Sequence, residues 1–221
     1  FMKMRSKILL CTLTSILCFG ILESCSTAGH GSPRGNAASR SQTAAFIRVP
    51  LAHYVRGLKS VNVTIDATEY SFLVDSGGGR TLLTPDTAAR LGCKPWGRDV
   101  GYRMTGEPVA FQNCAQLRGS LVSYEIRVAP VAVFDLNSLL PKELPRLDGV
   151  LSLDAFRGQV ITLDWANNLL IVHSSADTED AIRSHGAPAR FATGENGAAL
   201  SVLLPVQGAQ GRMWFLLDSG N

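Results

Sequence analysis

A six-residue phrase occurs twice in this chain of 221 residues, and it constrains the fold more than any other feature. The first copy, FLVDSG, is Phe72–Gly77, and the second copy, FLLDSG, is Phe215–Gly220. Each copy carries one carboxylate, Asp75 or Asp218, from an apolar run into a Ser-Gly turn. The repeat therefore predicts two buried strands of the same kind, each holding one aspartate at its end.

Paired carboxylates have a chemistry that a single carboxylate lacks. Two carboxylates held close together cannot both ionise comfortably, so they share one proton and act as general base and general acid at mildly acidic pH. The residues after each aspartate suit such a site, because small hydroxyls can hydrogen-bond across it and glycines let the backbone turn sharply. The expected catalytic pair is Asp75 and Asp218, and the expected active-site loops contain Ser76, Gly77, Gly78, Ser219 and Gly220.

Three longer segments resemble the pepsin and retropepsin superfamily of aspartic proteases. Residues 60–91 resemble its first active-site segment, with a strand pair that ends in FLVDSGG and is followed by Thr81-Leu82-Leu83 and a short helix. Leu147–Phe156 resembles the segment that closes a lobe behind the catalytic loop, and Val160–Ile171 resembles the last hairpin of a lobe in bacterial retropepsin-like proteins. The resemblance implies a mostly β fold with short helices, built as an acid-protease lobe.

The sequence departs from the family pattern at two places. Gly77-Gly78-Gly79 stands where family members usually carry one Gly followed by Ala or Ser, which predicts a looser loop. Ser152 stands where the closing segment usually has Gly.

The repeat extends upstream of the two aspartates. An offset of 143 residues joins Asp75 to Asp218 and pairs apolar residues with apolar residues. The pairs are Val61 with Leu204, Val63 with Val206, Phe72 with Phe215, Leu73 with Leu216 and Val74 with Leu217. The chain begins with Phe1 ahead of Met2 and stops inside the second copy, so we expect a truncated second lobe whose remainder lies downstream. We also expect nothing in residues 198–221 to hold Asp218 opposite Asp75.

Composition shifts along the chain divide it into five expected segments. Gly, Ser, Ala, Asn and Arg are frequent in the tether, and Ser, Pro, Gly and acidic residues are frequent in the linker, as is typical of connecting segments. The segments are a signal peptide (1–24), a flexible tether (25–45), a first retropepsin-like lobe (46–173), an interlobe linker (174–197) and the incomplete start of a second lobe (198–221).

The first 24 residues have the pattern of an export signal. A basic stretch, Lys3–Lys7, precedes an apolar run of fifteen residues, 8–22, which is short for a membrane span of roughly 20 residues. Leu22-Glu23-Ser24-Cys25 then resembles a bacterial lipobox, which implies that Cys25 is lipidated and becomes the new N-terminus. An ordinary signal peptide with an incidental Cys is the alternative. We expect a lipid-anchored protein of the bacterial cell envelope, periplasmic or at the outer membrane.

Two of the five cysteines, Cys93 and Cys114, lie beyond the signal segment and Cys25. An even pair in an oxidising compartment is compatible with one disulfide, and two separate buried thiols are the equal alternative. Two cysteines without a nearby His supply too few ligands for a metal site. We expect neither a metal nor any other cofactor.

The implied function is that of an aspartic endopeptidase acting on a peptide or protein substrate. Water held between Asp75 and Asp218 would be deprotonated by one carboxylate and attack the peptide carbonyl while the other protonates it. One alternative is a retropepsin-like lipoprotein that binds peptides in the same cleft without cleaving them. Another is a one-lobe enzyme that dimerises through two copies of Asp75, although such an enzyme would not need Asp218.

Other chemistries find little support in the sequence. Removing residues 1–24 takes away three basic residues and one acidic residue, which leaves a net charge near +1 and no footprint for nucleic acid. No Lys follows Gly77-Gly78-Gly79, so a phosphate-binding loop is not predicted. The four histidines are scattered, and Asp148, Asp154 and Asp164 are assigned to turns and caps.

Periodicity and capping signals predict the local elements. Strands are expected near residues 46–50, 60–66 and 69–75. A helix is expected from the Thr84 cap to Leu91, with Gly92 as its left-handed stop. Residues 100–133 are expected to form two or three strands with turns near Gly106 and Gly119, in the position of the family's flap.

Overall fold

Strands dominate the protein, in a computed structural model that describes residues 46–103, 105–173, 186–194 and 196–220. Short helices complete it, so the expected mostly β fold is confirmed. The strands are β1 (Phe46–Pro50), β2 (Ala52–His53), β3 (Lys59–Ile65), β4 (Thr68–Val74), β5 (Leu82–Leu83), β6 (Trp96–Tyr102), β7 (Pro108–Cys114), β8 (Leu117–Leu121), β9 (Tyr124–Val128), β10 (Val131–Val133), β11 (Gly149–Leu151), β12 (Val160–Asp164), β13 (Leu169–His173), β14 (Arg190–Ala192), β15 (Ser201–Gly208) and β16 (Gly211–Leu216). The helices are α1 (Pro85–Arg90) and the 3-10 turns η1 (Leu136–Leu139) and η2 (Leu153–Phe156).

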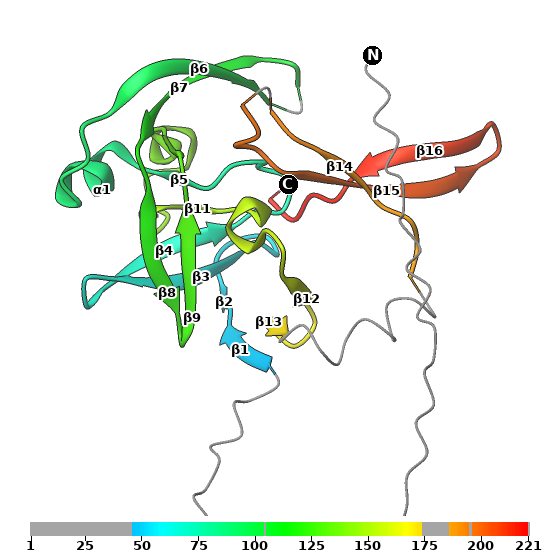
Figure 1. Cartoon of the computed structure of the whole chain (residues 1–221), viewed down its shortest axis with the longest axis horizontal. Helices are drawn as coiled ribbons and strands as arrows, with labels where there is room; N and C mark the ends of the chain where they lie inside the picture. Colours follow the sequence, from blue (N-terminus) through cyan, green and yellow to red (C-terminus); the bar gives the residue numbers. More distant parts are fainter. Residues whose placement is uncertain (1–45, 104, 174–185, 195, 221) are drawn as a thin grey trace, which may run out of the picture. The chain divides into compact units, whose positions relative to one another are not determined.

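The largest sheet has the order β6-β7-β10-β5-β11-β4-β3-β8-β9, with β2 paired to β3 (Figure 1). Strand β11 lies parallel to β4 and antiparallel to β5, so it fills the space between the two ends of the loop 75–81, which is the expected catalytic loop. The backbone N–H of Asp75 donates to the carbonyl oxygen of Leu151 at 3.0 Å. The first carboxylate is therefore fixed by the centre of the sheet and not by a free loop.

The β3–β4 hairpin that carries Asp75 follows from its alternating sequence. Apolar side chains at every second position of β3 face the core. Val63 of β3 and Phe72 of β4 are fully buried there. The turn is made by Asp66 and Ala67, whose φ angles of 47° and 62° belong to a tight hairpin turn. The strands expected near 46–50, 60–66 and 69–75 are confirmed to within a residue as β1, β3 and β4.

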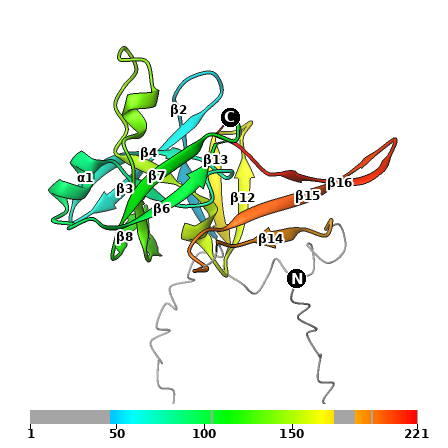
Figure 2. The ribbon, with the colours of Figure 1, turned by 90° about the horizontal axis from the view of Figure 1, so that it is seen from above.

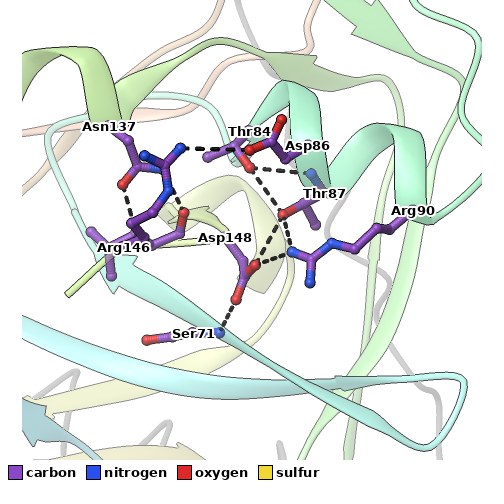
Figure 3. Close-up of polar contacts among 9 residues, drawn as sticks. Ser71, Thr84, Asp86, Thr87, Arg90, Asn137, Arg146 and Asp148 are labelled. Atoms are coloured by element: carbon purple, nitrogen blue, oxygen red, sulfur yellow. Dashed lines mark hydrogen bonds and ion pairs between the residues drawn. The ribbon is translucent and has the colours of Figure 1, made fainter.

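Helix α1 begins and ends where its capping signals place it. The Thr84 hydroxyl accepts from the Thr87 backbone N–H at 3.3 Å, Pro85 opens the helix, and Gly92 takes a φ of +67° just beyond its end. A short polar cluster holds the helix against the sheet (Figure 3). There Asp148 accepts from the Ser71 backbone N–H at 2.8 Å, from the Thr87 hydroxyl at 3.1 Å and from the Arg90 guanidinium.

One expected turn is wrong. Gly119 lies inside strand β8, where it pairs with Ile126, and the turn falls at Val122, whose φ is +56°. A Cβ at Gly119 would lie 2.9 Å from the carbonyl oxygen of Thr64, so the glycine serves the close approach of β8 to β3. The turn expected near Gly106 is present between β6 and β7, with a φ of +82°.

Two smaller sheets complete the described part of the chain. One has the order β1-β13-β12, and the other has the order β14-β15-β16, which is orange to red in Figures 1 and 2. Strand β14 lies within the segment that we expected to be a linker, so residues 190–192 are ordered by pairing with β15. None of the described helices combines the length and apolar composition needed to cross a membrane.

Candidate active site

The structure brings Asp75 and Asp218 together at the ends of β4 and β16. A Cβ on Gly77 would lie 2.5 Å from Oδ1 of Asp218, and a Cβ on Gly220 would lie 2.5 Å from Oδ1 of Asp75. Each turn glycine thus lies against the opposite carboxylate. Any larger residue at either glycine would push the two carboxylates apart, which is why the pair needs glycine there.

The two halves of the site are joined by a reciprocal pair of serines. The backbone N–H of Ser76 donates to Oγ of Ser219, and the backbone N–H of Ser219 donates to Oγ of Ser76, both at 3.0 Å. The two hydroxyls donate in turn to the carbonyl oxygens of Leu217, at 2.9 Å, and Val74, at 3.4 Å. Our expectation that nothing in residues 198–221 holds Asp218 opposite Asp75 is therefore wrong. We refer to these four hydrogen bonds as the serine clasp.

The catalytic loop is also more firmly held than its three glycines predict. The backbone N–H groups of Gly77 and Gly78 both donate to Oδ1 of Asp75 at 2.8 Å, and that of Gly220 donates to Oδ1 of Asp218 at 2.9 Å. A Cβ at Gly78 would lie 2.8 Å from Oδ2 of Asp75. The glycine run therefore serves close approach of backbone amides to the carboxylate, and the expected looseness is not found.

The surroundings of Asp75 favour its protonated form. Burial raises the pKa of the Asp75 carboxyl above its ordinary value, and the negative charge of Asp218 raises it further. The amide hydrogen bonds from Gly77 and Gly78 act in the opposite direction without cancelling the rise in pKa. A proton shared between two such groups belongs to the pair.

A second set of contacts fastens the approach to β15 against the catalytic loop. The Arg157 guanidinium donates to the carbonyl oxygens of Gly197, Ala198 and Ala199 at 2.8, 3.2 and 2.6 Å. The backbone N–H of Leu200 donates to the carbonyl oxygen of Gly79 at 2.7 Å. The segment that leads to the second carboxylate is thus held at both ends, here and at the serine clasp.

Behind the catalytic loop lies a buried carboxylate with a structural role. Oδ1 of Asp154 accepts from the Thr81 hydroxyl at 2.6 Å and from its backbone N–H at 3.0 Å. The Thr81 hydroxyl in turn accepts from the backbone N–H of Ser152 at 3.1 Å. Burial raises the pKa of Asp154, although hydrogen bonds from Thr81 oppose the rise. This cluster fixes the exit of the loop. Asp154 therefore has a structural role, but it bonds to Thr81 on a distant segment and does not serve the turn or cap that we expected.

A cleft of about 840 Å³ runs beside the catalytic loop. Its walls come from the loop, from the β6–β7 hairpin and from the segment before β15. The lining residues are Gly77, Gly78, Gly79, Arg80, Leu82, Arg98, Asp99, Val100, Gly101, Tyr102, Arg103, Val109, Phe111, Ala132, Phe134, Gly194, Asn196, Ala199, Ser201 and Leu216. The cleft has the size and the mixed polar and apolar lining of a small-ligand or peptide site.

The two hairpins that carry the aspartates repeat each other pair for pair. Ser60 faces Leu73 and Ile65 faces Thr68 in β3–β4, and all six such pairs recur in β15–β16 after a shift of 143 residues. The internal repeat read from the sequence is therefore a repeat of strand register as well.

Cys93 and Cys114 form a disulfide with a Cα–Cα distance of 5.9 Å, which ties the segment after α1 to the end of β7. The remaining expected site residue, Cys25, lies outside the described residues.

Sequence reasoning missed Arg80, Asp99, Asn113 and Arg157, which hold the walls of the cleft. Only the place of Arg80, directly after the glycines, could have drawn attention to it.

Residues 61–155 match the model of a family described as aspartyl protease. Comparison with curated sequences finds no match.

Among solved structures, a retropepsin-like aspartic protease from Rickettsia conorii is similar at 16% identity and a TM-score of 0.37, over 57% of this chain and 90% of that one. Basic 7S globulin from soybean is similar at 13% identity and a TM-score of 0.44, over 73% of this chain and 57% of that one. Over residues 61–155, the chain is thus similar to the aspartyl protease family.

Proposed function

We propose that the protein is an aspartic endopeptidase that hydrolyses peptide bonds in the cleft beside Asp75 and Asp218. The observation that carries this proposal is the serine clasp, which joins two loops 143 residues apart and sets their carboxylates side by side. A carboxylate ending an apolar strand is costly to bury without a purpose, and two of them facing each other are costlier. The family match over residues 61–155 supports the same class of reaction.

The proposed reaction needs only the two carboxyl groups and water. The ionised carboxylate takes a proton from a water molecule, whose oxygen attacks the peptide carbonyl carbon, while the protonated carboxyl gives its proton to the carbonyl oxygen. The tetrahedral intermediate then collapses: the carboxyl that took the water proton gives it to the leaving nitrogen, and the other carboxylate regains its proton from a hydroxyl of the intermediate. The raised pKa of Asp75 suits it to hold the shared proton at mildly acidic pH.

The test is a digest of a peptide library, analysed by mass spectrometry, with the full-length protein and two variants. We expect cleavage on the acidic side of neutrality, with activity falling as pH rises past the raised pKa of Asp75 because the shared proton is then lost. Asp75→Asn and Asp218→Asn should each abolish cleavage to a similar extent, since residues that act as one unit give non-additive losses.

Three outcomes contradict the proposal. If Asp218→Asn cleaves as well as the wild type, the two-carboxylate mechanism is wrong. If the wild type cleaves nothing between pH 3 and 8 and yet binds peptides, the protein is a peptide-binding module. Activity that depends on Asp75 alone and on dimer formation would indicate a one-lobe homodimer.

We further propose that β15–β16 begins a second lobe. Four apolar side chains on one face of this hairpin are 36–50% exposed, whereas their equivalents on β3–β4 are 0–7% exposed. The equivalent pairs are Val61 and Leu204, Val63 and Val206, Tyr70 and Met213, and Phe72 and Phe215. A structure of a longer chain that leaves this face uncovered would contradict the second lobe.

Anchoring at Cys25 in a bacterial envelope remains part of the proposal. Its support is the lipobox-like Leu22-Glu23-Ser24-Cys25 after a short apolar run. Cys25→Ala should end the incorporation of labelled fatty acid, and unchanged labelling would exclude the anchor.

A further inference from the structure

The side chain of Arg80 is almost wholly inside the protein, five residues after Asp75, with an exposed fraction of 11%. Its Nη1 donates to Oδ2 of Asp99 at 3.0 Å, and its Nη2 donates to Oδ1 of Asn113 at 2.7 Å. Nδ2 of Asn113 donates to the same Asp99 oxygen at 3.1 Å. Arg80, Asp99 and Asn113 thus form a closed ring of three hydrogen-bonded side chains, which we name the Arg80 triad.

The members of the triad come from the two walls of the cleft. Arg80 belongs to the catalytic loop, whereas Asp99 lies on β6 and Asn113 on β7. The guanidinium also lies 5.0 Å from the centre of the Phe111 ring and donates to the carbonyl oxygen of Pro130 at 3.2 Å. Asn113 is 2% exposed, so the ring is shielded from water on its inner side. A planar guanidinium fork held in this way fixes both distance and direction between the walls.

An unbroken run of hydrogen bonds leads from the triad to the first carboxylate. The backbone N–H of Arg80 donates to the carbonyl oxygen of Gly78 at 2.7 Å, and the backbone N–H of Gly78 donates to Oδ1 of Asp75 at 2.8 Å. A displacement of the hairpin that pulls Arg80 therefore reaches Asp75 through only two hydrogen bonds and the short backbone between them.

We propose that the Arg80 triad positions the β6–β7 hairpin relative to the catalytic loop, so that a peptide lying against the hairpin meets the Asp75–Asp218 pair in the productive geometry. Arg80, Asp99 and Asn113 are positioning residues for the proposed proteolysis and do not take part in the proton transfers. This inference rests on the proposed function. It adds residues that neither the repeat nor the family pattern identifies.

The first test separates positioning from plain stability. Arg80→Lys keeps the charge, but a single ammonium cannot reproduce the fork that reaches Asp99 and Asn113 together. We expect kcat to fall about 10- to 100-fold with KM changed less than about threefold. A misplacement of the peptide by up to about 1 Å weakens the transition state more than it weakens binding of the substrate. An unchanged kcat in a folded Arg80→Lys protein, assayed well below its Tm, would overturn the inference.

A double-mutant cycle tests whether the residues act together. Asp99→Asn preserves side-chain size and leaves the Arg80–Asn113 hydrogen bond in place, so we expect this variant to fold even if Arg80→Lys does not. Within one unit, the double variant should lose about as much kcat as the worse single variant. Additive losses would mean that the two residues act separately. The control is the exposed pair Glu125 and Arg127, 3.6 Å apart and outside the cleft lining, where Glu125→Gln and Arg127→Lys should change kcat less than twofold.

Amide hydrogen exchange tests the coupling without any need for cleavage. The substitution Asp99→Asn is made in the Asp75→Asn protein, where it changes a side chain on the β6–β7 hairpin alone. Relative to Asp75→Asn, we expect severalfold faster exchange at residues 77–79 as well as at 98–103. Faster exchange confined to 98–103 would overturn the inference whether or not the protein is a protease. A wild type that shows the coupled exchange but cleaves no peptide would leave the triad intact and reject only the proposed function.

Discussion

At the scale of single residues, the serine hydroxyls in and around the site differ in whether they have hydrogen-bond partners. The hydroxyls of Ser76 and Ser219 are fully engaged in the serine clasp. The hydroxyl of Ser152 is buried and has no hydrogen-bond partner among the described residues. An unpartnered buried hydroxyl costs about 1–3 kcal/mol relative to one exposed to water. Ser152 is thus a residue whose side chain opposes folding at the place where the family prefers glycine.

Ser152→Ala should therefore raise the free energy of unfolding by about 1 kcal/mol, because it removes the hydroxyl and leaves the φ of −109° acceptable to alanine. Urea unfolding measures this change. The control is Ser138→Ala, which removes an exposed hydroxyl that donates to the carbonyl of Asp135 at 2.7 Å and should lower stability slightly. A loss of 1 kcal/mol or more in Ser152→Ala would show that the hydroxyl has a role that the structure does not reveal.

At the scale of elements, helix α1 is held by the side chain of Asp148, which directly precedes strand β11. Asp148 joins Ser71 of β4 to Thr87 and Arg90 of α1, as Figure 3 shows. Its side chain is 23% exposed, so these charge-assisted hydrogen bonds are partly shielded from water. Asp148→Ala should lower the free energy of unfolding by about 2 kcal/mol, measured by urea unfolding.

The matched control for Asp148 is Glu125→Ala. Glu125 is 77% exposed and pairs with Arg127 at 3.6 Å, a kind of contact that contributes about 0–1 kcal/mol. Equal losses in the two variants would contradict the structural role of Asp148. A larger loss in Asp148→Ala would support it.

The elements also show which features could be predicted from the sequence. The β3–β4 hairpin and helix α1 were predictable because alternation, a Thr-Pro cap and a stop glycine are local signals. Gly119 was misread as a turn, because its reason is the carbonyl of Thr64 on a neighbouring strand. The Arg80 triad was not predictable either, since it depends on a register shift between Trp96 and Asp99 that sets which side chain faces the loop.

At the scale of the whole molecule, the carboxylate pair links folding to pH. The folded-state pKa of Asp75 is raised, so its contribution to stability is fully present below its ordinary pKa of 3.8 and is lost as pH rises through the raised value. Asp75→Asn cannot ionise and escapes this loss. Asp75→Asn should therefore be more stable than the wild type at pH 7, and the difference should shrink towards zero below pH 3.8.

Thermal unfolding of the two proteins between pH 3 and 7 measures this difference. Asp154 also has a raised pKa, but Asp154 and its partner Thr81 are the same in both proteins. The contribution of Asp154 to the pH dependence therefore cancels in the difference in Tm. A difference in Tm that is independent of pH would contradict the raised pKa of Asp75. It would mean that the substitution acts through packing alone.

The serine clasp also sets an order of events during biosynthesis. The ribosome adds roughly 5–20 residues per second, so Ser219 follows Ser76 after about 7–30 s. All strands of the largest sheet, including β11 beside β4, lie within the part of the chain that is made first. That part therefore has time to fold before the second hairpin exists. Until then Asp75 has no partner and the nascent chain carries half a site. Separation along the chain therefore acts as a delay that keeps the paired carboxylates from forming before the strands that hold Asp75 have been made.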